Sequence, residues 1–258
     1  MDRRKRLLRI GETLERFFGD LHWWPGESPF EVTVGAILTQ NTNWANVERA
    51  IGRLKAEGVL EPRALHGLDD DTLADLIRPS GYFRVKAKRL KAFLDVLCGD
   101  FGGDLGQMLS GDLLQARQRL LGISGIGEET ADSILLYAGG RPVFVIDAYT
   151  RRILARHGII DGEPTYGELQ RLFMTCLPRD AGLYNRYHAL IVETGKRYCR
   201  KQPRCGACPL RGTAGRDGGG KTGPAIAEPA VRRRGRATCS SGKKSSRRDS
   251  RKTGTPLS

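Results

Sequence analysis

The stretch LGISGIGEETADSILLYA, residues 121–138, decides the fold. Three glycines, Gly122, Gly125 and Gly127, separate a helix-compatible approach from an amphipathic pattern that begins at Glu128. Glycine adopts positive φ and lets the backbone approach another molecule, and the free N–H groups of a helix start attract anions. The stretch therefore predicts a helix-hairpin-helix unit that grips phosphate. An ordinary glycine-rich turn between packed helices is the alternative.

The segment that follows the hairpin points to one carboxylate. The apolar run 143–146 comes after Gly139, Gly140 and Pro142, and it ends at Asp147, where a helical pattern begins. This order predicts an extended connector that delivers Asp147 to a helix start. A carboxylate at that position could cap the helix, or it could stabilise positive charge that develops on a sugar. Asp147 is therefore the candidate catalytic residue, with capping as the alternative role.

The remainder of the chain carries apolar residues at helical spacing in nearly every segment. We predict an all-α protein of about eight to eleven helices, arranged as two helical subdomains that flank a cleft. One subdomain covers about 35–138 and bears the hairpin, and the other joins 1–34 to 139–211. From residue 212 the composition changes to Gly, Ser, Thr, Arg and Lys, so we expect 212–258 to be a disordered basic tail.

The charge of the chain favours a polyanionic partner. Its 258 residues carry a formal net charge of +14, and 13 of the 43 Lys and Arg residues lie within 211–258. Such a run can bind nucleic acid or can simply be a solvated tail. We find neither a long apolar stretch nor a signal-peptide pattern, so we expect a cytoplasmic, nucleoid-associated monomer without a membrane partner.

A resemblance to a known family emerges from these motifs taken together. ISGIGEETA (123–131), with Val145-Ile146-Asp147 and Arg151-Arg152-Ile153, resembles the hairpin and catalytic-aspartate region of the endonuclease III superfamily. FEVTVGAILTQNT (30–42) resembles the early helix and wedge loop of that superfamily. The resemblance implies a base-excision DNA glycosylase, which flips a damaged base out of duplex DNA and hydrolyses its N-glycosidic bond through Asp147.

Three further stretches are similar to the 3-methyladenine DNA glycosylase III branch: HWWP (22–25), TQNTNW (39–44) and RPSGYFRVKAKRL (78–90). The resemblance places a base pocket at Trp23, Trp24, Pro25 and Trp44, with Trp23 and Trp44 stacking on the base. It places DNA contacts at Gln40, Asn41, Gly122, Gly125, Gly127, Thr130, Lys86 and Lys88. Trp24 could instead be plain core, and the lysines a solvated helix face.

One departure from the family narrows the mechanism. Bifunctional members carry a nucleophilic lysine just after the last glycine of the hairpin, where this chain has Glu128 and Glu129. Without that amine no Schiff base forms with the sugar, which predicts a monofunctional enzyme that uses water on an alkylated purine such as 3-methyladenine. The alternatives are an endonuclease III-like glycosylase and AP lyase for oxidised pyrimidines, and a non-catalytic helix-hairpin-helix DNA-binding protein.

Three crowded cysteines, Cys199, Cys205 and Cys208, resemble the iron–sulfur loop of the superfamily. A 4Fe–4S cluster takes four thiolates, but the position near Ala214 where the fourth is expected carries no cysteine. Cys239 could reach back through the tail. An iron–sulfur cluster, a zinc ion and free thiols therefore all stay open for residues 199–208.

Overall fold

The computed structural model describes residues 2–21 and 23–213. The chain divides into two compact units, 1–223 and 224–258, and the second lies outside the described residues. Outside them, too, are His22, Cys239 and all of the predicted basic tail from residue 214 onward. The predictions made for those residues therefore stay predictions.

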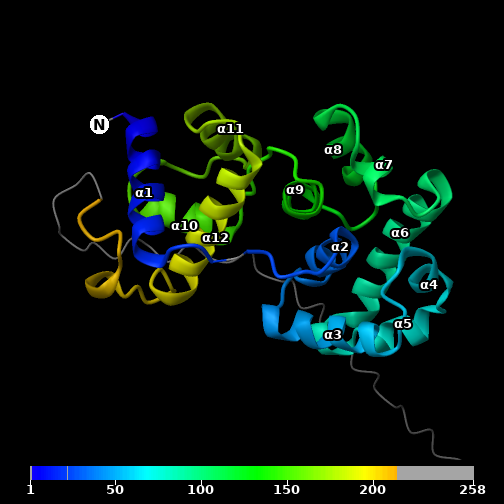
Figure 1. Cartoon of the computed structure of the whole chain (residues 1–258). Helices are drawn as coiled ribbons and strands as arrows, with labels where there is room; N and C mark the ends of the chain where they lie inside the picture. Colours follow the sequence, from blue (N-terminus) through cyan, green and yellow to red (C-terminus); the bar gives the residue numbers. More distant parts are fainter. Residues whose placement is uncertain (1, 22, 214–258) are drawn as a thin grey trace, which may run out of the picture. The chain divides into compact units, whose positions relative to one another are not determined.

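The described part of the chain consists of helices and loops, without a β-strand (Figure 1). This confirms the all-α prediction. It contains twelve α-helices rather than eight to eleven, because α4, α5 and α7 are too short to show a full apolar period. In chain order the elements are α1 (Arg3–Phe18), α2 (Pro29–Leu38), α3 (Trp44–Ala56), α4 (Pro62–Gly67), α5 (Asp70–Leu76), η1 (Arg78–Ser80), α6 (Phe83–Phe101), α7 (Leu105–Leu109), α8 (Leu113–Leu121), α9 (Glu128–Ser133), η2 (Ile134–Ala138), α10 (Ala148–Arg156), α11 (Tyr166–Cys176), α12 (Ala181–Arg197) and η3 (Cys205–Ala207).

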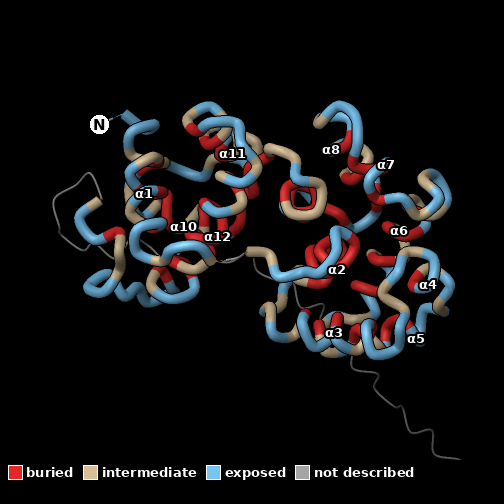
Figure 2. The backbone as a smooth tube through the Cα atoms, viewed as in Figure 1, coloured by how far each residue is buried: buried red, intermediate tan, exposed pale blue. Residues whose placement is uncertain are grey.

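Helix α2 lies at the centre of one group of packed helices. Nine of its ten residues are buried, as Figure 2 shows by colour, because the sequence PFEVTVGAIL is apolar on nearly every face. It contacts α3, α6, α9 and η2. Ser28 caps its first turn through the Glu31 backbone nitrogen at 3.1 Å, and Pro29 starts it with a fixed φ.

The second group consists of α1, α10, α11 and α12, and α12 also contacts η2. That contact places the middle of α12 next to η2, which continues α9 after the hairpin. Because α2 spans residue 35, it crosses the predicted subdomain boundary, and the boundaries at 35 and 138 stay predictions. None of the helices in the described ranges combines the length and the apolar character needed to cross a membrane.

The connector between η2 and α10 has the expected form. Residues 143–146 are buried and carry no helical or strand assignment, and α10 begins directly after Asp147. The prediction that a non-helical connector delivers Asp147 to a helix start is therefore confirmed.

Candidate active site and DNA interface

The hairpin joins α8 to α9 through three glycines, one of which occupies a backbone conformation that only glycine accommodates well. Gly125 has a φ of +86°, and a methyl group at this position would overlap the side chain of Arg89 from α6. Gly127 precedes α9 with extended backbone and no side-chain cap, so its φ of −94° would accept other residues. Gly122 ends α8 in a right-handed helical conformation. The glycines thus have different roles, and Gly125 is the most constrained.

Gln40 locks the loop after α2 onto the hairpin. Its side-chain nitrogen donates to the Gly125 carbonyl at 3.1 Å and to the Thr130 hydroxyl at 3.0 Å, and its side-chain oxygen accepts from Arg89. Thr130 is itself buried. Gln40 and Thr130 were expected to contact DNA, but this arrangement commits both side chains to contacts within the protein. The neighbouring Asn41 is exposed and has a φ of +55°.

The two lysines expected to contact DNA have different positions on α6. Lys86 is only 1% exposed, and its ammonium donates to the carbonyls of Leu38 at 2.7 Å and Ser80 at 2.6 Å. Burial lowers the pKa of Lys86 to about 8. A phosphate contact does not fit this placement, because the side chain lies on the same helix face as Leu90 and Phe93. Lys88 is exposed.

Asp147 uses its two carboxylate oxygens differently. Oδ1 caps α10 by accepting from the backbone nitrogen of Thr150 at 2.7 Å and from its hydroxyl at 2.8 Å. Oδ2 lies 3.7 Å from Nε2 of His188. The residue is only 8% exposed. Both roles considered from the sequence are thus structurally compatible, since capping occupies one oxygen and leaves the other available.

Two residues that the sequence did not single out, Tyr137 and His188, connect Asp147 to the ring of Trp24. The Tyr137 hydroxyl hydrogen-bonds Nδ1 of His188, and the Tyr137 ring lies 4.8 Å from the ring of Trp24. Burial lowers the pKa of His188, whereas burial and the Asp147 charge raise the pKa of Tyr137. At neutral pH both groups are therefore uncharged.

Trp24, Trp44 and Tyr137 form the aromatic cluster, with Trp24 in the middle. The Trp24 and Trp44 rings meet edge to face at 5.1 Å, above Gly35 of α2. A methyl group at Gly35 would lie 3.4 Å from each indole, so the glycine leaves room for both rings. Trp23 was expected to stack on the base together with Trp44. Trp23 contacts Trp24 edge to face, the Lys196 ammonium lies 4.9 Å from its ring centre, and its stacking on a base stays a prediction.

A cavity of about 450 Å³ lies beside Trp23 and Tyr137. Residues of α1, the loop after it, η2 and α12 line its walls, among them Glu15, Asp20 and Arg186. Asp147 is not one of its lining residues. Pro25, the fourth predicted pocket residue, is exposed.

Glu129 lies in the first turn of α9, at the position where the family resemblance predicts a lysine in bifunctional members. Glu129 is exposed, and the Asp147 carboxylate acts on it. Desolvation and that like charge raise the pKa of Glu129 to about 7, and Arg151 partly opposes the shift. The site thus holds two carboxyl groups and no amine at position 129.

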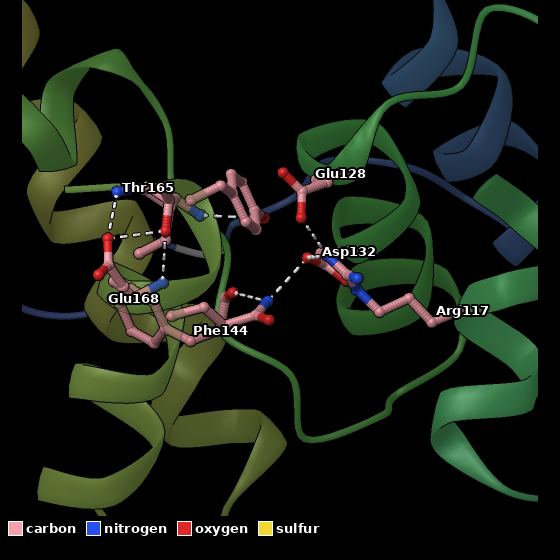
Figure 3. Close-up of polar contacts among 9 residues, drawn as sticks. Arg117, Glu128, Asp132, Phe144, Thr165 and Glu168 are labelled. Carbon is pink, nitrogen blue, oxygen red and sulfur yellow. Dashed lines mark hydrogen bonds and ion pairs between the residues drawn. The ribbon is translucent and has the colours of Figure 1, made fainter. Parts of the chain in front are cut away.

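A buried ion pair fixes the hairpin helices to the connector (Figure 3). Arg117 of α8 grips Asp132 of α9 with two bonds, at 2.7 and 3.0 Å, and Asp132 is fully buried. Gln170 of α11 donates to the same Asp132 carboxylate at 2.7 Å and to the Phe144 carbonyl at 2.8 Å. One carboxylate therefore connects the two hairpin helices, α11 and the connector that ends at Asp147.

The cysteine loop does not present a cluster site in the described residues. Cys199 is buried and its sulfur accepts from Arg156 at 3.3 Å, while Cys205 is exposed. Burial raises the pKa of the Cys208 thiol, and Cys199 and Cys205 are close enough to add to that rise. Residues 2–21 and 23–213 contain no group of three or more His, Cys, Asp or Glu side chains arranged to hold a metal. These residues do not fit the four-thiolate cluster, and Cys239 lies outside them.

The burial of Lys86 and His188 can be recognised from helical spacing in the sequence. Lys86 lies at helical spacing from Phe83, Leu90 and Phe93, which assigns it to the buried face of α6. His188 likewise lies at helical spacing from Tyr184 and Ile191 on the buried face of α12. Which partner each side chain meets could not be read locally, because Tyr137 and Asp147 belong to distant segments.

The chain matches the family model described as HhH-GPD superfamily base excision DNA repair protein over residues 34–179. A Methanocaldococcus jannaschii protein, named as a candidate DNA repair glycosylase, is 46% identical over 206 residues, which cover 80% of this chain and 94% of that protein. H. pylori 3-methyladenine DNA glycosylase bound to 1,N6-ethenoadenine is 30% identical, with a TM-score of 0.64 over 76% of this chain and 98% of that one. An endonuclease III–DNA complex, at 22% identity, shares the fold with a TM-score of 0.70 over 81% of this chain and 94% of that one.

Proposed function

Because the chain belongs to the HhH-GPD superfamily of base excision DNA repair proteins, we propose that it is a monofunctional DNA glycosylase for alkylated purines. The substrate is double-stranded DNA with a damaged base such as 3-methyladenine. The resemblance to the superfamily, predicted from the motifs, is confirmed by the family match and by the relatives. The alkylated-purine substrate is supported by the similarity to the H. pylori enzyme.

The observation that carries the proposal is that the two carboxylate oxygens of Asp147 have different partners. With Oδ1 held by Thr150, Oδ2 is the oxygen that can face a flipped nucleotide. As the N-glycosidic bond breaks, its electron pair leaves with the base and positive charge develops on the sugar. A carboxylate oxygen stabilises that charge and positions a water molecule, which adds to C1′ and gives its proton to that carboxylate.

The chemistry around Asp147 favours a base that leaves readily. An alkylated purine carries a positive charge that is neutralised on departure, so no strong acid is required. Indole rings hold such a cation by stacking and cation–π attraction, each contributing about 1–2 kcal/mol. Trp23 and Trp44 are the residues proposed to supply these faces, and Trp24 contacts both of their rings edge to face. Glu129 in place of an amine disfavours the Schiff base of a lyase.

The test uses methylated duplex DNA and the full chain. Released bases are identified by chromatography, and the DNA is run on a gel with and without alkali. We expect 3-methyladenine release and breaks only after alkali, with release abolished in Asp147→Asn. Breaks without alkali would favour the endonuclease III-like lyase. DNA binding without base release in the wild type would favour a non-catalytic binding protein.

A further inference from the structure

Nε2 of His188 is a buried polar atom without a hydrogen-bond partner within the described residues. His188 is 5% exposed, and its other ring nitrogen, Nδ1, bonds the Tyr137 hydroxyl. A buried polar atom that lacks a partner costs roughly 1–3 kcal/mol, so its retention calls for a reason. The nearest charged group is Oδ2 of Asp147, 3.7 Å away.

The protonation states follow from the surroundings of the ring. A neutral imidazole carries one N–H, and the tautomer is inferred from its hydrogen bonds. Tyr137 stays protonated because burial raises its pKa, so its hydroxyl can donate to Nδ1. The proton of His188 then lies on Nε2 and points toward Asp147. The opposite tautomer would direct a lone pair at the carboxylate, which is repulsive.

The hydrogen-bond donors of Tyr137 and His188 form a line that runs toward Asp147. Tyr137 donates to His188, and His188 directs Nε2–H toward Oδ2 of Asp147, while Thr150 holds Oδ1. Hydrogen bonds of this kind in a free enzyme are often long and shorten when substrate is bound. The imidazole can therefore orient Oδ2 of Asp147 by donating a hydrogen bond, without any proton transfer between the two groups.

We propose that His188 is a positioning residue, which orients the free carboxylate oxygen of Asp147 by Nε2–H, and that Tyr137 fixes the tautomer in which it does so. The proposal rests on the proposed glycosylase function. Because the Tyr137 ring also lies against Trp24, the same side chain touches the aromatic cluster and the line of donors. Tyr137 thereby links the position of a base on the indole rings to the orientation of the Asp147 carboxylate.

The first test separates orientation from DNA binding. Glutamine carries an amide nitrogen near the place of Nε2, whereas leucine fills the space without a donor. His188→Leu should lower the single-turnover rate of base release by about 10- to 100-fold, the usual effect of losing an outer-shell partner, and leave DNA affinity within about two-fold. His188→Gln should recover most of the rate. His66→Gln, on α4, is the matched control.

A leucine variant as fast as the wild type would overturn the proposal while the glycosylase function stands, and so would a glutamine variant as slow as the leucine one. Urea unfolding of each variant shows whether lost rate reflects lost structure. A wild-type protein that binds methylated DNA and releases no base would overturn both the function and the proposal.

The second test reads the tautomer directly and requires no activity. The chain has four histidines, so nitrogen-15 NMR of the imidazoles gives a small set of signals, and His188 is assigned by its loss in His188→Gln. We expect a neutral ring with the proton on Nε2, and a shifted Nδ1 signal in Tyr137→Phe. A proton on Nδ1, or a charged ring at neutral pH, would overturn the proposal.

Discussion

Thr150 is bonded twice to a single oxygen of Asp147, by its backbone nitrogen at 2.7 Å and by its hydroxyl at 2.8 Å. This relationship separates two functions of one side chain, because the helix cap depends on Oδ1 alone. Replacements at position 147 can therefore distinguish the loss of chemistry from the loss of the cap.

Asp147→Asn keeps an oxygen that can accept from Thr150, whereas Asp147→Ala removes it. We expect Asn to leave the free energy of unfolding nearly unchanged and Ala to lower it by about 1 kcal/mol, the usual value of an N-cap. Both should reduce base release by at least about 100-fold. Urea unfolding and single-turnover kinetics measure the two effects. Equal stability of Ala and wild type would contradict the capping role.

Gly125→Ala should destabilise the protein and weaken DNA binding. The backbone conformation alone costs a residue with a side chain about 1–2 kcal/mol, and the methyl group also displaces Arg89. Gly127→Ala is the control, because a methyl group there meets nothing within 4 Å and the backbone is extended. Thermal unfolding should separate the two variants. Similar loss of stability in both would argue against the special role of Gly125.

Arg117→Met should be strongly destabilising. It leaves the Asp132 carboxylate buried without its cationic partner, and breaking a buried ion pair in this way costs about 3–5 kcal/mol. The double variant with Asp132→Asn should regain part of that loss. Urea unfolding of the single and double variants tests the coupling, which additive losses would disprove.

Glu129 should make stability depend on pH. Its pKa is about 7 in the folded protein against an ordinary 4.5, so the folded state binds the proton more tightly than the unfolded state does. Its contribution to stability is therefore present at low pH and is lost as pH rises from about 4.5 to about 7. Relative to Glu129→Gln, the wild type should lose stability across this range. A constant difference between pH 5 and 8 would contradict the raised pKa.

Gln40 and Asn41 should respond differently to truncation. Gln40→Ala removes three hydrogen bonds that lock the loop to the hairpin, and it should lower the free energy of unfolding by about 1 kcal/mol or more. Asn41→Gly removes the exposed amide, so it should weaken DNA binding and base release. Because glycine accepts the positive φ at this position, the free energy of unfolding should change little. Loss of stability in Asn41→Gly alone would reverse this assignment.

The sequence was informative wherever a local pattern decides structure. Glycine spacing located the hairpin, the apolar run 143–146 located the connector, and Asp147 preceded a helix as an N-cap residue does. It was less informative where partners lie far apart in the chain. Nothing local could show that Gln40 meets Thr130, 90 residues away, or that Tyr137 meets His188, 51 residues away.

Lys86 shows why residue type alone misleads at an interface. The family resemblance placed Lys86 at the DNA interface, but helical periodicity assigns position 86 to the buried face of α6. Its long aliphatic chain is buried and two backbone carbonyls satisfy the ammonium. Helical spacing therefore indicates the burial of position 86, which the lysine side chain alone does not.

The bonds from Gln40 and Arg89 also bear on how a lesion is found. Because they hold the loop against the hairpin, we expect the protein to adapt little to a passing duplex. The deformation that opens a base pair must then fall on the DNA, whose local stiffness depends on its sequence and damage. We expect the search to favour sites where stacking is already weak, so flanking sequence should alter excision rates even at bases that no side chain touches.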